Sequence, residues 1–187
     1  MRRGLIFLIM VFFLVTEGRA QAETPLRTLM TGDDSRGWQA VGRLNMGANS
    51  FCTGALIAPD LVLTAAHCMF DKTTGARIAD GEIEFLADWR GGRAAAYRNV
   101  RRSLVHPDFT VSGENFMARV ANDVAILELD QPVRNTSITP FATHARPGTG
   151  DEVGVVSYAQ DRACLLYTSP SPRDFSCNLV CRLLREN

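Results

Sequence analysis

An all-β fold, either an antiparallel barrel or a sandwich, is predicted by two features of this 187-residue sequence. Short apolar segments of strand length recur along the chain, and turn signals rich in glycine, proline and asparagine separate them. No helical period is sustained over more than a turn or two. Many short strands with such punctuation are typical of β-barrels and β-sandwiches.

The expected strands can be placed in chain order. Residues 58–60 (Ala-Pro-Asp) form a turn signal between two apolar segments, which predicts a strand–turn–strand unit. Gly91-Gly92 and residues 135–137 mark loops. The strands themselves are expected at residues 38–44, 51–56, 61–64, 82–85, 95–100, 124–129 and 151–158.

Residues 1–22 have the features of a secretory signal peptide. Arg2 and Arg3 precede an unbroken apolar run at residues 5–15, and residues 20–22 (Ala-Gln-Ala) form a cleavage signal. The apolar run is shorter than the roughly 20 residues that a membrane-spanning helix needs. We therefore expect cleavage after Ala22 and a secreted or periplasmic protein without a membrane anchor. An uncleaved anchor is the alternative.

The composition is that of an ordinary globular protein. Hydrophobic residues make up 46% of the chain, and 20 basic residues balance 20 acidic ones. These values exclude disordered, collagen-like and coiled-coil chains. A balanced charge also gives no electrostatic reason to expect nucleic acid or an anionic membrane as a partner.

A histidine at the end of an apolar strand is the first candidate site residue. His67 follows two small alanines in residues 61–68 (Leu-Val-Leu-Thr-Ala-Ala-His-Cys), which leaves room for the imidazole to face a cleft. Cys52 and Cys68 bracket this hairpin, and an exported protein can join them in a disulfide that contributes about 3 kcal/mol. Such a bond would hold a general base in place.

An aspartate before a second apolar strand is the other candidate. Asp123 precedes residues 124–129 (Val-Ala-Ile-Leu-Glu-Leu). A carboxylate beside a buried strand is costly unless it is hydrogen-bonded or paired. If it accepted the imidazole N–H, it would fix the histidine tautomer and stabilise the imidazolium.

The two segments resemble the histidine and aspartate motifs of chymotrypsin-like (trypsin-like) serine proteases. The matching residues are 64–68 (Thr-Ala-Ala-His-Cys) and 122–127 (Asn-Asp-Val-Ala-Ile-Leu), in the family's order. Residues 37–41, 106–109 and 131–133 also resemble family segments, so the likeness covers about residues 38–158. The resemblance implies that His67 is the general base, that Asp123 orients it, and that Cys52 and Cys68 form the histidine-loop disulfide.

The same resemblance implies an architecture and an activity. The fold is expected to be the family's double antiparallel β-barrel, with the first barrel at residues 23–136 and the start of the second at residues 137–163. The implied reaction is peptide-bond hydrolysis by acyl transfer to a serine, with protein or peptide substrates. No cofactor or metal is implied, and a monomer is expected.

The serine motif of the family is missing. The family carries Gly-Asp-Ser-Gly-Gly or a close variant in its second barrel, and no serine after position 151 has flanking glycines. No nucleophile can therefore be nominated. The chain as written is expected to lack protease activity and to expose apolar surface that a complete second barrel would cover.

The last segment, residues 164–187, departs from the rest of the chain. It fits neither a strand pattern nor the family. One choice of codons for residues 164–174 resembles the adapter of transposase-made sequencing libraries. Residues 179–184 resemble the flanking adapter in the same frame. We expect this tail to be translated adapter and not native protein.

Two other interpretations remain open. One is a catalytically inactive relative that acts as a secreted binding module. The other is a small exported β-domain that binds a metal through His67, His106 and acidic residues. Retention of both His67 and Asp123 favours the enzyme over the inactive relative.

Overall fold

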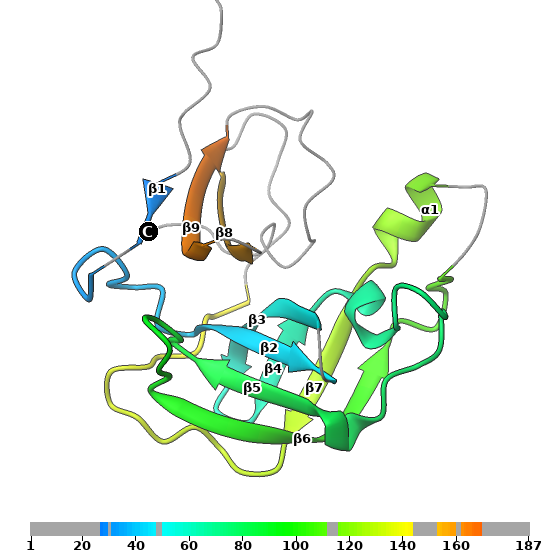
Figure 1. The fold of residues 1–187 in the computed structure, drawn as a ribbon, viewed down its shortest axis with the longest axis horizontal. Helices are drawn as coiled ribbons and strands as arrows, with labels where there is room; N and C mark the ends of the chain where they lie inside the picture. The colour runs from blue at the N-terminus through cyan, green and yellow to red at the C-terminus, as the bar shows by residue number, and fades with distance from the viewer. Residues whose placement is uncertain are drawn as a thin grey trace, which may run out of the picture.

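The computed structural model describes residues 27–29, 31–47, 50–111, 116–143, 153–159 and 162–169, which form mostly strands and the turns between them (Figure 1). The expected signal peptide lies outside the described residues. In chain order the elements are β1 (Arg27–Thr28), β2 (Val41–Met46), β3 (Ser50–Ala58), β4 (Leu61–Thr64), the 3-10 turns η1 (Ala66–Met69) and η2 (Asp80–Glu82), β5 (Ile83–Ala87), β6 (Ala96–Val105), helix α1 (Phe116–Ala121), β7 (Ala125–Leu129), β8 (Val153–Ala159) and β9 (Arg162–Ser169).

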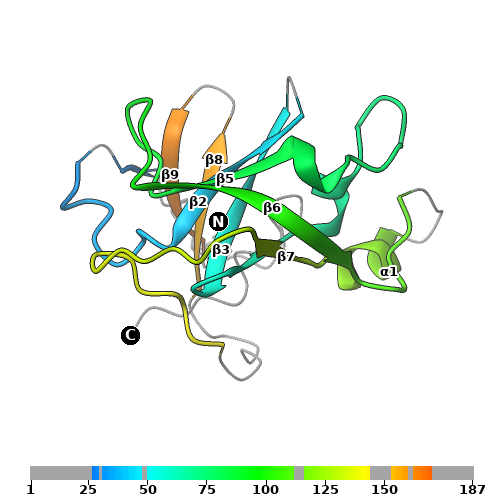
Figure 2. The same ribbon diagram turned by 90° about the horizontal axis from the view of Figure 1, so that it is seen from below.

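Strands β2 to β7 close into one antiparallel barrel, in the order β2-β3-β4-β7-β6-β5. The ring is closed where β5 returns to β2 and Gly42 pairs with Ala87. Figure 2 shows β2, β3, β5, β6 and β7 of this barrel from below. Closure gives every strand a partner on both sides, which removes free sheet edges. The expected all-β fold is thus confirmed.

Alternation along the strands fills the barrel with apolar side chains. Leu44, Phe85 and Leu127 point inward from three strands and are completely buried. Gly42 is required beside Phe85, because a Cβ at position 42 would lie 2.3 Å from the aromatic ring. The packed interior gives the loops at the barrel ends a rigid base.

A second sheet lies beside the barrel, next to β2 and β3 (Figure 1). Its strand order is β1-β9-β8, so β1 pairs with β9 and not with the barrel. Val156 and Tyr158 of β8 are buried in a cluster with Val41 and Ala55, which lie on the outer face of β2 and β3. The barrel therefore has a second apolar contact on its outside.

Three expectations about the elements need correction. The first barrel strand begins at Val41 and not at Trp38, because residues 31–40 form turns in which Val41 donates to the Trp38 carbonyl. The strand expected at 95–100 continues to Val105, past a bulge between Val100 and Arg102 that interrupts the alternation. The expectation that residues from 164 onward fit no strand is wrong for residues 164–169, which belong to β9 and pair with β8.

Candidate active site

Pairing between β4 and β7 brings the two candidate residues together. Thr64, the last residue of β4, is the register partner of Ala125, the first residue of β7. His67 lies in η1 directly after β4, and Asp123 lies just before β7. In an antiparallel pair the end of one strand meets the start of its neighbour. Residues 56 positions apart in sequence thus meet at one end of the barrel.

Both oxygens of Asp123 are engaged with His67. Oδ1 accepts the backbone N–H of His67 at 2.8 Å, and Oδ2 lies 2.6 Å from the ring Nδ1. The first bond holds the carboxylate against the turn, and the second orients the imidazole. When Nδ1 carries a proton and donates it to Oδ2, Nε2 of the neutral ring is an acceptor.

The pair is buried on one side and open on the other. The Asp123 side chain is 14% exposed and the His67 side chain 38% exposed. Ala65 and Ala66, just before the histidine, are completely buried. The turn is therefore anchored in the core while part of the imidazole meets solvent. A shielded carboxylate beside an accessible imidazole is an arrangement suited to moving a proton at Nε2.

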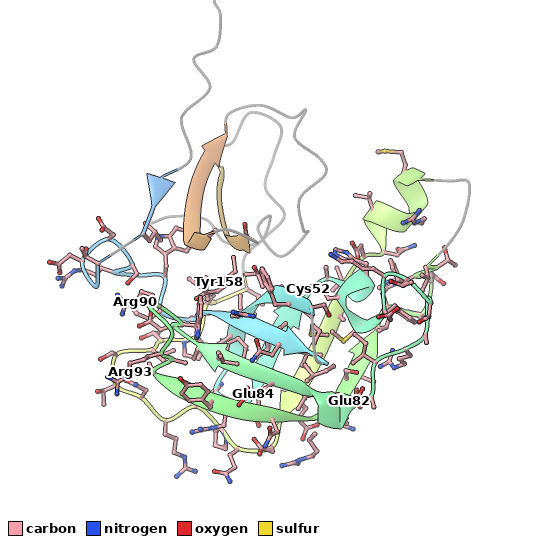
Figure 3. The ribbon with its side chains drawn as sticks, in the orientation of Figure 1. Cys52, Glu82, Glu84, Arg90, Arg93 and Tyr158 are labelled. Atoms are coloured by element: carbon pink, nitrogen blue, oxygen red, sulfur yellow. A yellow bond between two sulfur atoms is a disulfide. The ribbon has the colours of Figure 1, made fainter. Side chains whose placement is uncertain are left out.

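A disulfide supports the turn from the other side. Cys52 of β3 and Cys68 of η1 are joined, with their Cα atoms 6.2 Å apart, which confirms the expected pairing. The bond ties the residue after His67 to β3, on which Figure 3 labels Cys52. Together with Asp123, it holds the histidine backbone at two points.

The surroundings of His67 do not favour the metal-site interpretation. Among the described residues, the side chains there that lie close enough together to share a metal ion are Cys52, His67 and Cys68, within 4.8 Å of one another. Both sulfurs are consumed in the disulfide, so neither is a thiolate ligand. His106 instead accepts the backbone N–H of Asp108 through Nδ1, as part of a local turn.

One feature of the site was not expected from sequence. The bond from the His67 backbone N–H to Asp123 follows from the shape of η1, for which the residue pattern gave no signal. Within the described part of the chain, no serine hydroxyl is hydrogen-bonded to His67. Also within the described residues, no helix is long and apolar enough to cross a membrane.

Comparison with known proteins gives a consistent family assignment. The Trypsin family matches residues 30–169 of this chain, so the expectation that the tail falls outside the family is wrong for residues 164–169. "Serine protease filzig" of Drosophila melanogaster is 33% identical over 109 residues, which are 56% of this chain and 6% of that protein. "Kallikrein 1-related peptidase-like b4" of Mus musculus is 29% identical over 139 residues, which are 71% of this chain and 51% of that protein. The chain thus spans less than two thirds of either relative.

A solved structure supports the fold. "Structure of Glu endopeptidase in complex with MPD" matches with a TM-score of 0.61 and 20% sequence identity, over 79% of this chain and 68% of that one. At this identity the likeness concerns the fold alone. The closed antiparallel barrel is therefore the chymotrypsin-like barrel that the sequence motifs suggested.

Proposed function

The chain belongs to the trypsin family, and from that membership we propose that it carries the general base and the orienting carboxylate of a serine endopeptidase. His67 is the base and Asp123 is the carboxylate. The observation that carries the proposal is the pair of contacts from Asp123 to the backbone N–H and Nδ1 of the same histidine.

The chemistry follows from the orientation of the imidazole. Because Asp123 holds Nδ1, the opposite nitrogen, Nε2, is the one that takes a proton from a serine hydroxyl as the oxygen attacks the scissile carbonyl. The carboxylate then stabilises the imidazolium. His67 returns the proton to the leaving amine, and a water molecule is activated in the same way to release the acyl group.

The nucleophile is proposed to come from sequence that this chain does not contain. Its serines lack the glycine-flanked context that the family uses. The backbone N–H groups that stabilise the oxyanion would accompany that serine. On this proposal, the chain as written does not hydrolyse peptide bonds.

The proposal also concerns the last segment of the chain, residues 164–187. Residues 164–187 are interpreted as translated adapter, on the support of the two codon resemblances in frame; against this interpretation, residues 164–169 pair with β8 and lie inside the family match. The native protein is proposed to be an exported monomer that acts on proteins or peptides, without a nucleic-acid or membrane partner.

Hydrolysis by the product of the complete source gene tests the assignment. We expect His67→Ala to lower kcat by about 10⁴-fold to 10⁶-fold and Asp123→Asn by about 10⁴-fold. Circular dichroism and thermal melting should show that both variants remain folded. Arg93→Gln, an exposed change on the loop after β5, is the control and should leave kcat unchanged.

Two results would contradict the proposal. Hydrolysis by the complete protein that survives His67→Ala would remove the histidine from the mechanism. A complete, folded protein that cleaves no peptide and forms no adduct with a serine-directed phosphonate would instead favour the inactive binding module.

A further inference from the structure

An arginine is held between two aromatic rings on the outer face of the barrel. Along β2, Leu44 points into the core and Arg43 points outward. The guanidinium carbon of Arg43 lies 4.5 Å from the centre of the Phe51 ring and 4.9 Å from the centre of the Trp89 ring. Contact with both rings restricts the guanidinium group, whose N–H groups remain donors for hydrogen bonds.

The second sheet completes this arrangement. The Trp89 ring meets the Tyr158 ring edge-on, with centroids 5.9 Å apart. The backbone N–H of Tyr158 donates to Oγ1 of Thr53, and Thr53 is the register partner of Arg43. Figure 3 labels Tyr158 of β8 and Cys52 of β3, and these two strands are in contact. The arginine is thus positioned by β2, β3, β8 and the loop after β5.

The charge of Arg43 has no counter-ion among the described residues. Its Nε is buried and has no hydrogen-bond partner there. Glu84, on the same outer face, accepts a hydrogen bond from Asn45 and forms no ion pair with Arg43 in the described part of the chain. A partly desolvated cation without a partner is costly, and a carboxylate matches the planar guanidinium edge.

The disulfide connects the strand segment that contacts the arginine to the turn that carries the imidazole. Phe51 precedes Cys52, and Cys68 follows His67, so the Cα atoms of Phe51 and His67 are at most about 14 Å apart. Asp123 occupies the Nδ1 side of the ring. An extended substrate that crosses Nε2 advances about 3.3 Å per residue, so roughly four residues span the distance to Phe51, which the arginine contacts.

We propose that Arg43 determines specificity by binding the carboxylate of an aspartate or glutamate side chain of the substrate. The inference rests on the proposed endopeptidase function. Phe51 and Trp89 are positioning residues that hold the guanidinium group so that it can form a paired hydrogen bond with the carboxylate.

Matched peptides and the complete enzyme test this proposal. The two peptides of a pair differ at one position, which is glutamate in one and glutamine in the other. The pairs cover the four positions on either side of the cleaved bond, and all peptides are amidated at the C-terminus. We expect kcat/KM to favour glutamate about tenfold at one position, mainly through KM. Arg43→Gln should abolish the preference by lowering kcat/KM for the glutamate peptide toward that of the glutamine peptide.

Two further variants test whether the preference comes from the Arg43 guanidinium group or only from positive charge. Arg93→Gln removes an exposed arginine at the barrel surface (Figure 3) and should keep the preference. Arg43→Lys keeps the charge but loses the planar edge, so the preference should fall below that of wild type. An unchanged preference in Arg43→Gln would overturn the proposal. An equal loss of activity on both peptides with a lower melting temperature would show that Arg43 is structural.

Free and amidated C-termini distinguish the source of the carboxylate. A preference seen only with free C-termini would replace side-chain recognition by recognition of the chain end. If no peptide is cleaved, binding of each peptide to the complete protein is measured by isothermal titration calorimetry. Tighter binding of the glutamate peptide would then uphold Arg43 although the proposed function fails, and equal binding would overturn both.

Discussion

The barrel and the β1-β9-β8 sheet differ in strand pairing and in where their apolar side chains are buried. Within the described residues, every barrel strand is paired on both sides and surrounds its own core. The sheet has β1 and β8 at its edges, and the buried side chains of β8 rest on the outer face of β2 and β3. The difference teaches that the His67–Asp123 pair is built by the self-contained part, through one contact between neighbouring strands.

Among the stability changes predicted for the two regions, loss of the disulfide should have the largest effect, and it should destabilise the barrel. The double change of Cys52 and Cys68 to serine is expected to lower the free energy of unfolding by about 3 kcal/mol, because the unfolded chain regains the freedom of a 16-residue loop. Urea denaturation measures this loss. Reduction of the wild-type protein with dithiothreitol should reproduce it. An unchanged midpoint would mean that the barrel holds the histidine turn without the bond.

The contact between the barrel and the β1-β9-β8 sheet should weaken when the Thr53 hydroxyl is removed. Thr53→Val removes the hydroxyl that accepts the Tyr158 backbone N–H at 2.9 Å, at a cost of about 1–2 kcal/mol. Hydrogen exchange should accelerate at Tyr158 while amides in β4 and β7 stay protected. Thr53→Ser keeps the hydroxyl and serves as the control. Equal acceleration in the barrel would show that the two regions unfold as one.

A smaller effect is expected from an aspartate at the end of β5, next to Trp89. Burial raises the pKa of Asp88 above its ordinary value of 3.8, and the hydrogen bond and charge of Arg90 oppose part of that rise. The folded protein therefore binds this proton more tightly than the unfolded chain does. The contribution of Asp88 to stability is present below pH 3.8 and is lost as the pH rises through the raised pKa.

Asp88→Asn should remove this pH dependence. The melting temperature of the variant is expected to fall less than that of wild type as the pH rises above 3.8. Melting curves of both proteins across that range provide the measurement. If the melting temperatures of the two proteins change with pH in the same way, burial does not raise the pKa of Asp88.

Sequence predicted the barrel better than the sheet for a physical reason. Alternation of apolar and polar residues is local, so β3, β4 and β7 were expected within two residues of their observed ends. The bulge in β6 and the pairing of β1 with β9 depend on residues far apart in the chain, and local patterns do not encode them. Helix α1 spans six residues, too few to show a helical period.

The candidate site was predictable for a similar reason. His67, Asp123 and the two cysteines lie in short motifs, and the structure brings all of them to one end of the barrel. Arg43 gave no signal, because a single arginine in a strand does not reveal which aromatic rings will flank it. That information comes from Phe51 on the neighbouring strand and from Trp89, 46 positions further along the chain.

The sequence of the source DNA beyond the codon for Ala163, obtained with reads from the opposite side, tests the central claim most directly. The claim is that this barrel supplies the base and the orienting carboxylate to a serine encoded further on. It predicts that the frame continues past Ala163 into a segment like Gly-Asp-Ser-Gly. Codons for residues 164–187 in the genome, followed by a stop, would contradict it, and an inactive binding role would then be the better account of the protein.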